Sequence, residues 1–181
     1  MNKKVCVITG SSSGIGAASA ILFSQRGWNV CVNYSKDPKP AEKVAALCRE
    51  HGADVLIERA DVSRDEQCRE LATRVKRHFG RCDALVNNAG TTKFVDLKDL
   101  DGISAADFQN IYAVNVIGPF QMIRALAPLL RSSANAAVVN VSSIAPLIGG
   151  GSSVAYIASK GALNALSLAL ARALEIGRAH V

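Results

Sequence analysis

Long hydrophobic runs are missing from this chain of 181 residues. No stretch approaches the roughly 20 consecutive apolar residues that a membrane-spanning helix needs. The N-terminus, Met1-Asn2-Lys3-Lys4, leads into only four apolar residues before Thr9, which is too short for the apolar core of a signal peptide. We therefore expect neither export nor a membrane partner, and we predict a cytoplasmic protein.

Paired cysteines are missing as well. The five cysteines are odd in number and far apart, and no two of them form a CxxC pair: Cys6, Cys31, Cys48, Cys68 and Cys82. This pattern argues against a disulfide framework and against a zinc site. A reducing compartment fits these thiols best, and we expect no bound metal.

Proline and glycine, at 5 and 14 residues, are too few for a collagen-like or linker-rich chain. Hydrophobic residues make up 49% and charged residues 20%, so a single folded domain with one core is expected. The net charge is +6, but only Arg74, Lys76, Arg77 and His78 cluster. We expect no nucleic-acid partner, because a scattered positive field suits a small phosphate-bearing ligand equally well.

Short apolar runs alternate with amphipathic helical patterns along the chain. Runs of this kind, rich in β-branched residues, are typical of strands buried on both faces of a parallel sheet. Apolar residues at helical spacing fill the segments around 41–48 and 68–79, and capping boxes are predicted at Ser63 with Glu66 and at Ser104 with Asp107. The predicted strands are Val5–Ile8, Val30–Val32, Val55–Ile57, Ala84–Val86 and Ala137–Val141.

This alternation predicts the α/β class, with a Rossmann-type doubly wound parallel sheet between two layers of helices. Ligands of such sheets bind beyond the carboxyl ends of the strands, where the winding reverses. The motifs that carry chemistry are therefore expected at that edge.

A glycine-rich loop, Thr9-Gly10-Ser11-Ser12-Ser13-Gly14-Ile15-Gly16, follows the first strand and opens a helix. Glycines permit a tight turn and let the backbone approach a pyrophosphate, which the free N–H groups of the helix start receive. The hydroxyls of Ser11 to Ser13 are expected to add donors. The alternative is a glycine-rich turn that binds nothing.

The order and spacing of several motifs resemble those of the short-chain dehydrogenases/reductases. The motifs are TGSSSGIG at 9–16, DV at 61–62, NNAG at 87–90, Asn115, Ser143 and Tyr156-x-x-x-Lys160. The resemblance spans residues 3 to about 174 and implies an NAD(P)-dependent oxidoreductase. It also implies that Asp61 accepts a hydrogen bond from the adenine amino group, with Val62 contributing its backbone. Asn88, Ala89 and Gly90 would line the adenosine side of the cofactor, and Asn87 is expected to be structural.

The end of the second strand bears on the choice of cofactor. NAD-preferring sites typically place a carboxylate there, whereas this sequence has Asn33-Tyr34-Ser35-Lys36. Asn33 leaves room for a 2′-phosphate, to which Ser35 or Lys36 would donate. We therefore expect NADP(H), and use of NAD(H) stays open because Ser13 stands where many NADP-using relatives carry Arg. The cofactor-binding residues expected here are Gly10, Ser12, Ser13, Gly14, Ile15, Gly16, Asn33, Tyr34, Ser35, Asp61, Val62, Asn88, Ala89, Gly90, Tyr156 and Lys160.

Four residues are the catalytic candidates: Asn115, Ser143, Tyr156 and Lys160. Tyr156 and Lys160 are one helical turn apart, so a nearby ammonium favours the phenolate that proton transfer needs. The resemblance implies that Ser143, rather than Ser142, binds the substrate oxygen, that Lys160 also holds the nicotinamide ribose, and that Asn115 sits in a locally interrupted helix and binds a relay water. Pro119 would explain that interruption.

The resemblance implies that the substrate is a small carbonyl compound or alcohol. The sequence is most similar to 3-oxoacyl-(acyl-carrier-protein) reductases, with glucose-type dehydrogenases and steroid or xenobiotic reductases as alternatives. Two other classes stay open: a non-catalytic dinucleotide-binding regulator and an RNA-binding protein. A stripe of small residues on the last helix, Ala158, Gly161, Ala162, Ala165 and Ala169, indicates either a homodimer or homotetramer contact or close packing on the chain's own sheet.

Relatives continue beyond this helix to a sixth strand, a lid over the substrate and a seventh strand. We therefore expect residues 1–174 to form a truncated dinucleotide-binding domain and residues 175–181 to be a non-native tail. The fifth strand would then lose its neighbour, and solubility and turnover of the chain would suffer.

Overall fold

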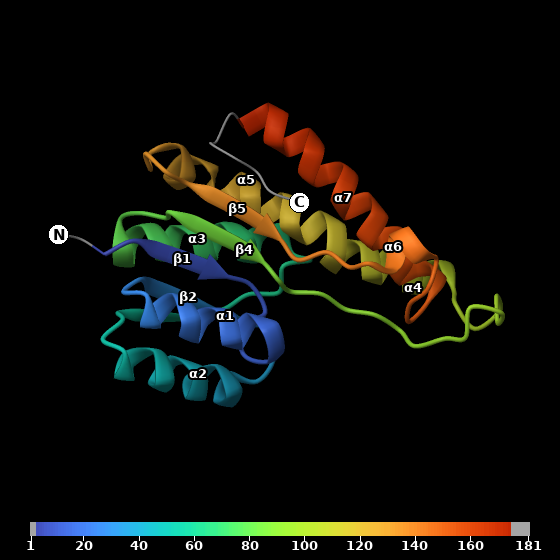
Figure 1. Ribbon diagram of the computed structural model, residues 1–181, viewed down its shortest axis with the longest axis horizontal. Helices are drawn as coiled ribbons and strands as arrows, with labels where there is room; N and C mark the ends of the chain where they lie inside the picture. Colours follow the sequence, from blue (N-terminus) through green and yellow to red (C-terminus); the bar gives the residue numbers. More distant parts are fainter. Residues whose placement is uncertain (1–2, 175–181) are drawn as a thin grey trace.

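The computed structural model describes residues 3–174 and shows a five-stranded parallel sheet covered by helices (Figure 1). The strand order is β3-β2-β1-β4-β5, so the winding reverses beside β1. The predicted Rossmann-type fold is confirmed. The elements are β1 (Val5–Ile8), α1 (Gly14–Gln25), β2 (Asn29–Tyr34), α2 (Pro38–Glu50), β3 (Val55–Arg59), α3 (Asp65–Phe79), β4 (Ala84–Asn87), α4 (Ala105–Tyr112), the π-helical turn η1 (Ala113–Ile117), α5 (Gly118–Arg131), β5 (Ala137–Asn140), α6 (Ala145–Ile148) and α7 (Val154–Leu174).

The sheet separates two apolar cores. On one face, Ile8 and Val32 pack with residues of α1 and α2. On the other face, Val7 and Leu85 pack with residues of α3 and α5, and the end of α7 contacts the same core. Because each strand buries alternate residues on opposite faces, the strands read as continuous apolar runs in the sequence.

Helix starts follow local capping chemistry. Asp37 caps α2 by accepting from the N–H of Lys39, and Pro38 occupies the first helical position. The capping box of Ser104 and Asp107 at α4 is confirmed. The one predicted at Ser63 and Glu66 is wrong, because the Ser63 hydroxyl donates to the Asp61 carboxylate at 2.7 Å and α3 starts two residues later.

The register brings all strand ends to one edge. Ile8 pairs with Val32 and with Val86, and Asn87 pairs with Asn140. The loops after these strands therefore meet, as the sequence predicts. Figure 1 shows that the segment between β4 and α4 runs outward from this edge, together with α6.

All five cysteines are buried and free, which confirms that they form no disulfide framework. Burial raises the pKa of the Cys68 and Cys82 thiols to about 12, so they stay protonated. These thiols pack as small apolar groups.

β5 has a neighbour on one side only within the described residues. Its Val139 is 43% exposed, as expected for an edge strand that lacks one partner. The predictions made for residues 175–181 concern a segment outside the described residues.

Two described helical segments, Ala105–Arg131 and Val154–Leu174, have the length and hydropathy of a membrane span, with mean hydropathy 1.3. Half of the apolar window in the first segment is buried, with Met122, Leu126 and Leu130 in the core, whereas 28% of the window in the second is buried. Two such helices are weak evidence of a membrane span, because core helices of soluble proteins have the same composition.

Asp83 joins three segments at the amino end of the sheet. Its carboxylate, 2% exposed, accepts from the N–H of Val5, from the Ser133 hydroxyl and twice from the Arg81 guanidinium. Burial alone would raise the pKa of Asp83, but the hydrogen bonds from Arg81, Ser133 and Val5 outweigh it and hold that pKa below its ordinary value.

We therefore expect the substitution Asp83→Ala to cost about 3 kcal/mol of unfolding free energy at pH 7, because the N–H of Val5 and the Ser133 hydroxyl lose the buried carboxylate that accepts from them. A carboxyl whose pKa is lowered by folding stabilises the protein above its unfolded pKa, and that contribution is lost as pH falls through the folded value. Urea unfolding between pH 7 and pH 3 checks this: the parent should lose stability more steeply than the variant. Asp101→Ala, on an exposed loop, is the control, and equal slopes for all three proteins would contradict the assignment.

Candidate active site

The glycine loop forms a tight turn that leads into α1. Gly10 and Gly14 adopt φ values of +61° and +54°, which side chains disfavour. The first helical hydrogen bond runs from the N–H of Ala17 to the carbonyl of Ser13, so the preceding amides have no partner in the helix. With no acidic residue in the first turn of α1, this end of the helix suits an anion.

The turn is held from β2 by Asn33 and Ser11. The Asn33 side chain accepts from the Gly10 N–H at 2.9 Å and donates to the carbonyls of Glu58 and Ala60. The Ser11 hydroxyl donates to the Ile8 carbonyl and accepts from the Asn33 N–H. Both side chains are thus occupied in positioning the loop. This corrects the expectation that the Ser11 hydroxyl donates to the phosphates, because its proton is donated to the Ile8 carbonyl. Asn33 lines the cleft, and its contact with the cofactor stays a prediction.

A second clamp comes from the segment after β4. The Thr9 hydroxyl accepts from the N–H groups of Asn88 and Ala89, both at 3.0 Å. The Asn88 side chain returns two hydrogen bonds, to the carbonyls of Thr9 and Gly10. Thr9 was not among the predicted residues, although it is the first letter of the TGSSSGIG motif.

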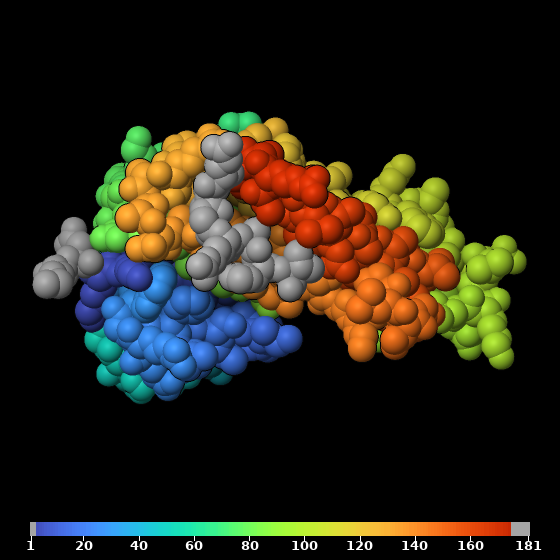
Figure 2. Space-filling view, turned by 45° about the horizontal axis from the view of Figure 1, so that its top comes forward, coloured from blue at the N-terminus to red at the C-terminus, as the bar shows by residue number. Residues whose placement is uncertain are grey.

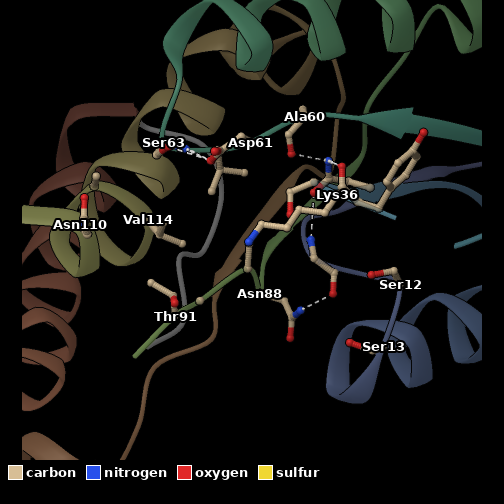
Figure 3. Close-up of a pocket in the computed structure, with 18 residues that line it drawn as sticks. Ser12, Ser13, Lys36, Ala60, Asp61, Ser63, Asn88, Thr91, Asn110 and Val114 are labelled. Atoms are coloured by element: carbon tan, nitrogen blue, oxygen red, sulfur yellow. Dashed lines mark hydrogen bonds between the residues drawn. The ribbon is translucent and has the colours of Figure 1, made fainter. Parts of the chain in front are cut away.

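Close approach explains why glycine is needed here. A Cβ on Gly10 would lie 2.9 Å from the Cα of Ala89, and one on Gly16 would lie 2.5 Å from Nδ2 of Asn88. The turn borders a cleft of about 750 Å³ at the carboxyl edge of the sheet (Figure 3). The N–H groups at the start of α1 that have no partner in the helix, together with a cleft of this size, fit a dinucleotide.

The far side of the cleft is formed by the loop after β3. Asp61 accepts from the N–H and the hydroxyl of Ser63 through the same carboxylate oxygen, Oδ1, and it lines the cleft. The carbonyl of Val62 accepts from the Gln121 side chain at 2.7 Å. Gly118 allows this approach, since a Cβ there would meet the Val62 side chain at 2.8 Å.

Lys36 is the cation that reaches the cleft from the end of β2. Figure 3 shows its side chain extending into the cleft, which it lines together with Tyr34 and Ser35. Arg59 pairs with Tyr34 in the register and donates from Nε to the Ser35 carbonyl at 3.2 Å. Arg59 therefore fixes the backbone just before Lys36. Sequence patterns did not single it out, because the contact joins separate strands.

Tyr156 and Lys160 lie together on the first turns of α7. The Lys160 Nζ is 5.8 Å from the centroid of the Tyr156 ring and donates to the carbonyl of Val141 at 2.7 Å. Lys160 is 4% exposed, and this burial lowers the pKa of its ammonium. Gly90 lies beside it, and a Cβ there would make ordinary contact with Nζ at 3.8 Å. The two side chains face one another, as the sequence predicts.

Asn115 is fully buried in the π-helical turn η1. Its side chain accepts from the Thr91 N–H and donates to the Thr91 carbonyl and to the Ser159 hydroxyl. The expected local interruption of the helix is confirmed, and Pro119 removes the amide that would bond the Asn115 carbonyl. The Asn115 side chain itself joins the loop after β4 to α7.

Ser142 and Ser143 differ in their partners. The Ser142 hydroxyl donates to the Asn164 side chain at 2.6 Å, which fixes it against α7. The Ser143 hydroxyl accepts from the Ala145 N–H at 3.1 Å and keeps its own proton for another acceptor. Ser143 is therefore the serine of this pair that can bind a substrate oxygen. Asn87 bridges to Asn140 at 2.8 Å, so the structural role predicted for it is confirmed.

The structure gathers most of the predicted cofactor residues around one cleft. Gly14, Ile15 and Gly16 shape the helix start behind it rather than line it, and Tyr156, Lys160 and Ser143 lie outside its lining. Lys36, predicted as a donor to a 2′-phosphate, also lines it. Residues that line it without having been predicted are Ala60, Ser63, Thr91, Asn110, Ala113 and Val114.

The fold and the site define a dinucleotide-binding protein of the Rossmann type. Comparison with known proteins identifies the family: the profile of the short chain dehydrogenases matches residues 4–180. The chain belongs to the short-chain dehydrogenase/reductase family.

Individual relatives have diverse names. The chain is 41% identical over 167 residues to a protein of Streptomyces violaceoruber named as a ketoacyl reductase of granaticin polyketide synthase, with 92% of this chain and 66% of that protein covered. Glucose 1-dehydrogenase 2 of Bacillus subtilis is 33% identical over 93% of this chain and 65% of its own length. The chain thus spans about two thirds of the length of these curated relatives.

Solved structures agree on the fold. A Burkholderia xenovorans protein assigned to the short-chain dehydrogenases/reductases superposes with a TM-score of 0.96 at 49% identity, covering 100% of this chain and 75% of the other. NAD⁺-bound xylitol dehydrogenase superposes with a TM-score of 0.89 at 30% identity, covering 99% and 68%.

Proposed function

We propose that the protein is an NAD(P)(H)-dependent oxidoreductase that transfers hydride between nicotinamide and a carbonyl or alcohol. The observation that carries this proposal is the buried Lys160 ammonium over the Tyr156 ring, at the edge of the sheet that also holds the glycine loop. An ammonium placed there stabilises the negative charge that develops on the tyrosine oxygen as it gives up a proton.

The chain's own residues have distinct roles in this proposal. The amides at the start of α1 hold the diphosphate, and the nicotinamide of the bound cofactor supplies or accepts the hydride. Ser143 donates a hydrogen bond to the substrate oxygen, and Tyr156 donates the proton to that oxygen during reduction. Asn115 positions Thr91 and α7 through its hydrogen bonds.

For the cofactor we propose NADP(H), with NAD(H) as the alternative. Support comes from Lys36 in the cleft and from the lack of a carboxylate at Asn33-Tyr34-Ser35. The alternative is supported by xylitol dehydrogenase, a neighbour whose solved structure is described as NAD⁺-bound.

We expect Lys36→Glu to lower kcat/KM for NADPH at least about tenfold, because a charge-assisted contact is replaced by repulsion of the 2′-phosphate. The value for NADH should change less than about threefold, since NADH has no such phosphate. Steady-state kinetics with both cofactors check the ratio. Lys43→Glu, an exposed change of the same charge on α2, should leave it unaltered. Equal losses with both cofactors would show that Lys36 does not contact the phosphate.

For the substrate we propose a 3-oxoacyl thioester of the kind reduced by 3-oxoacyl-(acyl-carrier-protein) reductases, with sugars and steroid or xenobiotic ketones as alternatives. NADPH absorbance followed with acetoacetyl thioesters, glucose and cyclic ketones tests the proposal. Oxidation of NADPH by a ketone supports an enzyme. Tight NADPH binding without any turnover would favour a non-catalytic dinucleotide-binding regulator.

We infer that the enzyme is a cytoplasmic homodimer or homotetramer. Ala158, Ala165 and Ala169 of the small-residue stripe are exposed, so these positions do not pack on the chain's own sheet. The free buried thiols support a reducing compartment.

A further inference from the structure

Large apolar side chains are exposed on the helix that follows Ser143 and on the loop after β4. The short helix α6 follows Ser143 directly, and three of its large side chains are exposed: Ile144, Leu147 and Ile148, with Leu147 at 80%. Phe94, at 85% exposure, comes from the loop after β4. Together these four residues are termed the apolar mouth. Large apolar side chains gathered beside a site mark a binding surface more often than chance exposure.

Hydrogen bonds place the two parts of the apolar mouth side by side. The Val95 N–H donates to the Ser152 carbonyl at 2.8 Å, and the hydroxyls of Thr92 and Ser152 are bonded to each other. Figure 2 shows α6 (orange) and the loop around residue 94 (lime green) at the same end of the molecule. The Tyr156 N–H donates to the Ser153 hydroxyl, which connects this surface to the start of α7.

The segment on the α6 side of the apolar mouth carries no charged side chain, whereas the loop after β4 carries several. The sequence from Ser132 to Ser159 has no Asp, Glu, Lys, Arg or His. In the opposite loop, Lys93 pairs with Asp107 at 2.8 Å, and Asp99 accepts from the Gly102 N–H. A sugar or polyol site needs convergent polar groups for its hydroxyls, whereas hydrocarbon needs apolar contact and little else.

We propose that the apolar mouth binds an extended hydrocarbon portion of the substrate, so that the enzyme acts on carbonyl compounds with a long acyl chain or fused rings rather than on sugars. This rests on the proposed function and narrows its substrate class. The continuity of Ile144 with Ser143 places the hydrocarbon beside the reacting oxygen. Because the Ser132–Ser159 segment has no charged side chain, a hydrocarbon bound there desolvates no charge of that segment.

Kinetics test the proposal with NADPH and N-acetylcysteamine thioesters. We expect kcat/KM for the 3-oxododecanoyl thioester to exceed that for the 3-oxobutanoyl thioester at least about tenfold, because added methylenes are removed from water. The double variant Leu147→Ser with Ile148→Ser should reduce this ratio to within about threefold of one. Leu47→Ser, an exposed leucine on α2, should retain the parent ratio. A fused-ring ketone and glucose form two further arms, and a preference for glucose would overturn the proposal.

An equilibrium measurement separates this proposal from the proposed function. The saturated dodecanoyl thioester cannot be reduced, so calorimetric titration reports its binding whether or not the protein turns over any ketone. Binding by the parent and by Leu47→Ser, weakened at least about tenfold in the double variant, supports the apolar mouth. Equal binding by all three proteins, or none by the parent, overturns it. A fall in molar mass of the double variant by light scattering, with unchanged thioester binding, would instead assign the surface to a second copy of the chain.

Discussion

Replacement of Tyr156 by Phe is expected to lower kcat at least about 100-fold, which corresponds to about 2.7 kcal/mol of lost transition-state stabilisation. The substitution removes only the phenolic oxygen, the one atom of Tyr156 that can pass a proton to a substrate. The ring itself remains over the Lys160 ammonium, 5.8 Å from the ring centroid to Nζ, so the local packing is conserved. A loss of this size would therefore report on chemistry rather than on folding.

Two further measurements make the Tyr156→Phe result specific. NADPH binding, followed by fluorescence titration, should stay within about threefold of the parent, because Tyr156 lies outside the lining of the dinucleotide cleft. Tyr112→Phe, a tyrosine on α4 that stacks on Phe108, is the matched control and should retain its turnover. Unchanged kcat in Tyr156→Phe would exclude it as the proton donor.

The sequence predicted the strands well because strands of a parallel sheet are buried on both faces and therefore appear as continuous apolar runs. It predicted the capping box at Ser104 because both partners lie within one helical turn. The Ser63 capping box failed because the Asp61 carboxylate, two residues earlier, accepts from the Ser63 N–H that Glu66 would have accepted from. Local spacing does not reveal which of two nearby carboxylates accepts from a backbone N–H.

Polar residues of the site were harder to assign than its glycines. Ser11 and Asn33 have the residue types and positions of phosphate ligands, yet their hydrogen bonds hold the turn in shape. Thr9 and Arg59 act through contacts between segments far apart in the sequence, so no local pattern points to them. Whether a polar residue contacts the phosphate or holds the loop in shape becomes clear only from its hydrogen-bond partners.

The uncharged stretch around α6 illustrates the same limit for the substrate. The sequence alone left 3-oxoacyl compounds, sugars and steroid or xenobiotic ketones open as substrates. In the fold, Leu147 and Ile148 of α6 are exposed and can contact a ligand, whereas Ala145 is buried and packs inside the protein. Exposure beside Ser143, rather than composition, is what favours a hydrocarbon ligand.

Gly16→Ala should abolish measurable dinucleotide binding, a loss of at least about 100-fold in Kd, because the added methyl has nowhere to go. Its Cβ would lie 2.5 Å from Nδ2 of Asn88 and 2.7 Å from the Gly10 carbonyl oxygen, the same two groups that bond each other across the turn. Relief requires that Asn88 release the turn, which then no longer presents its amides to a diphosphate. Gly161→Ala is the matched control, since this helical glycine has its nearest neighbour at 3.5 Å and a methyl there makes ordinary contact. NADPH fluorescence titration, with circular dichroism to verify folding, decides the outcome. A folded Gly16→Ala protein with the parent Kd would mean that the diphosphate does not sit on this turn.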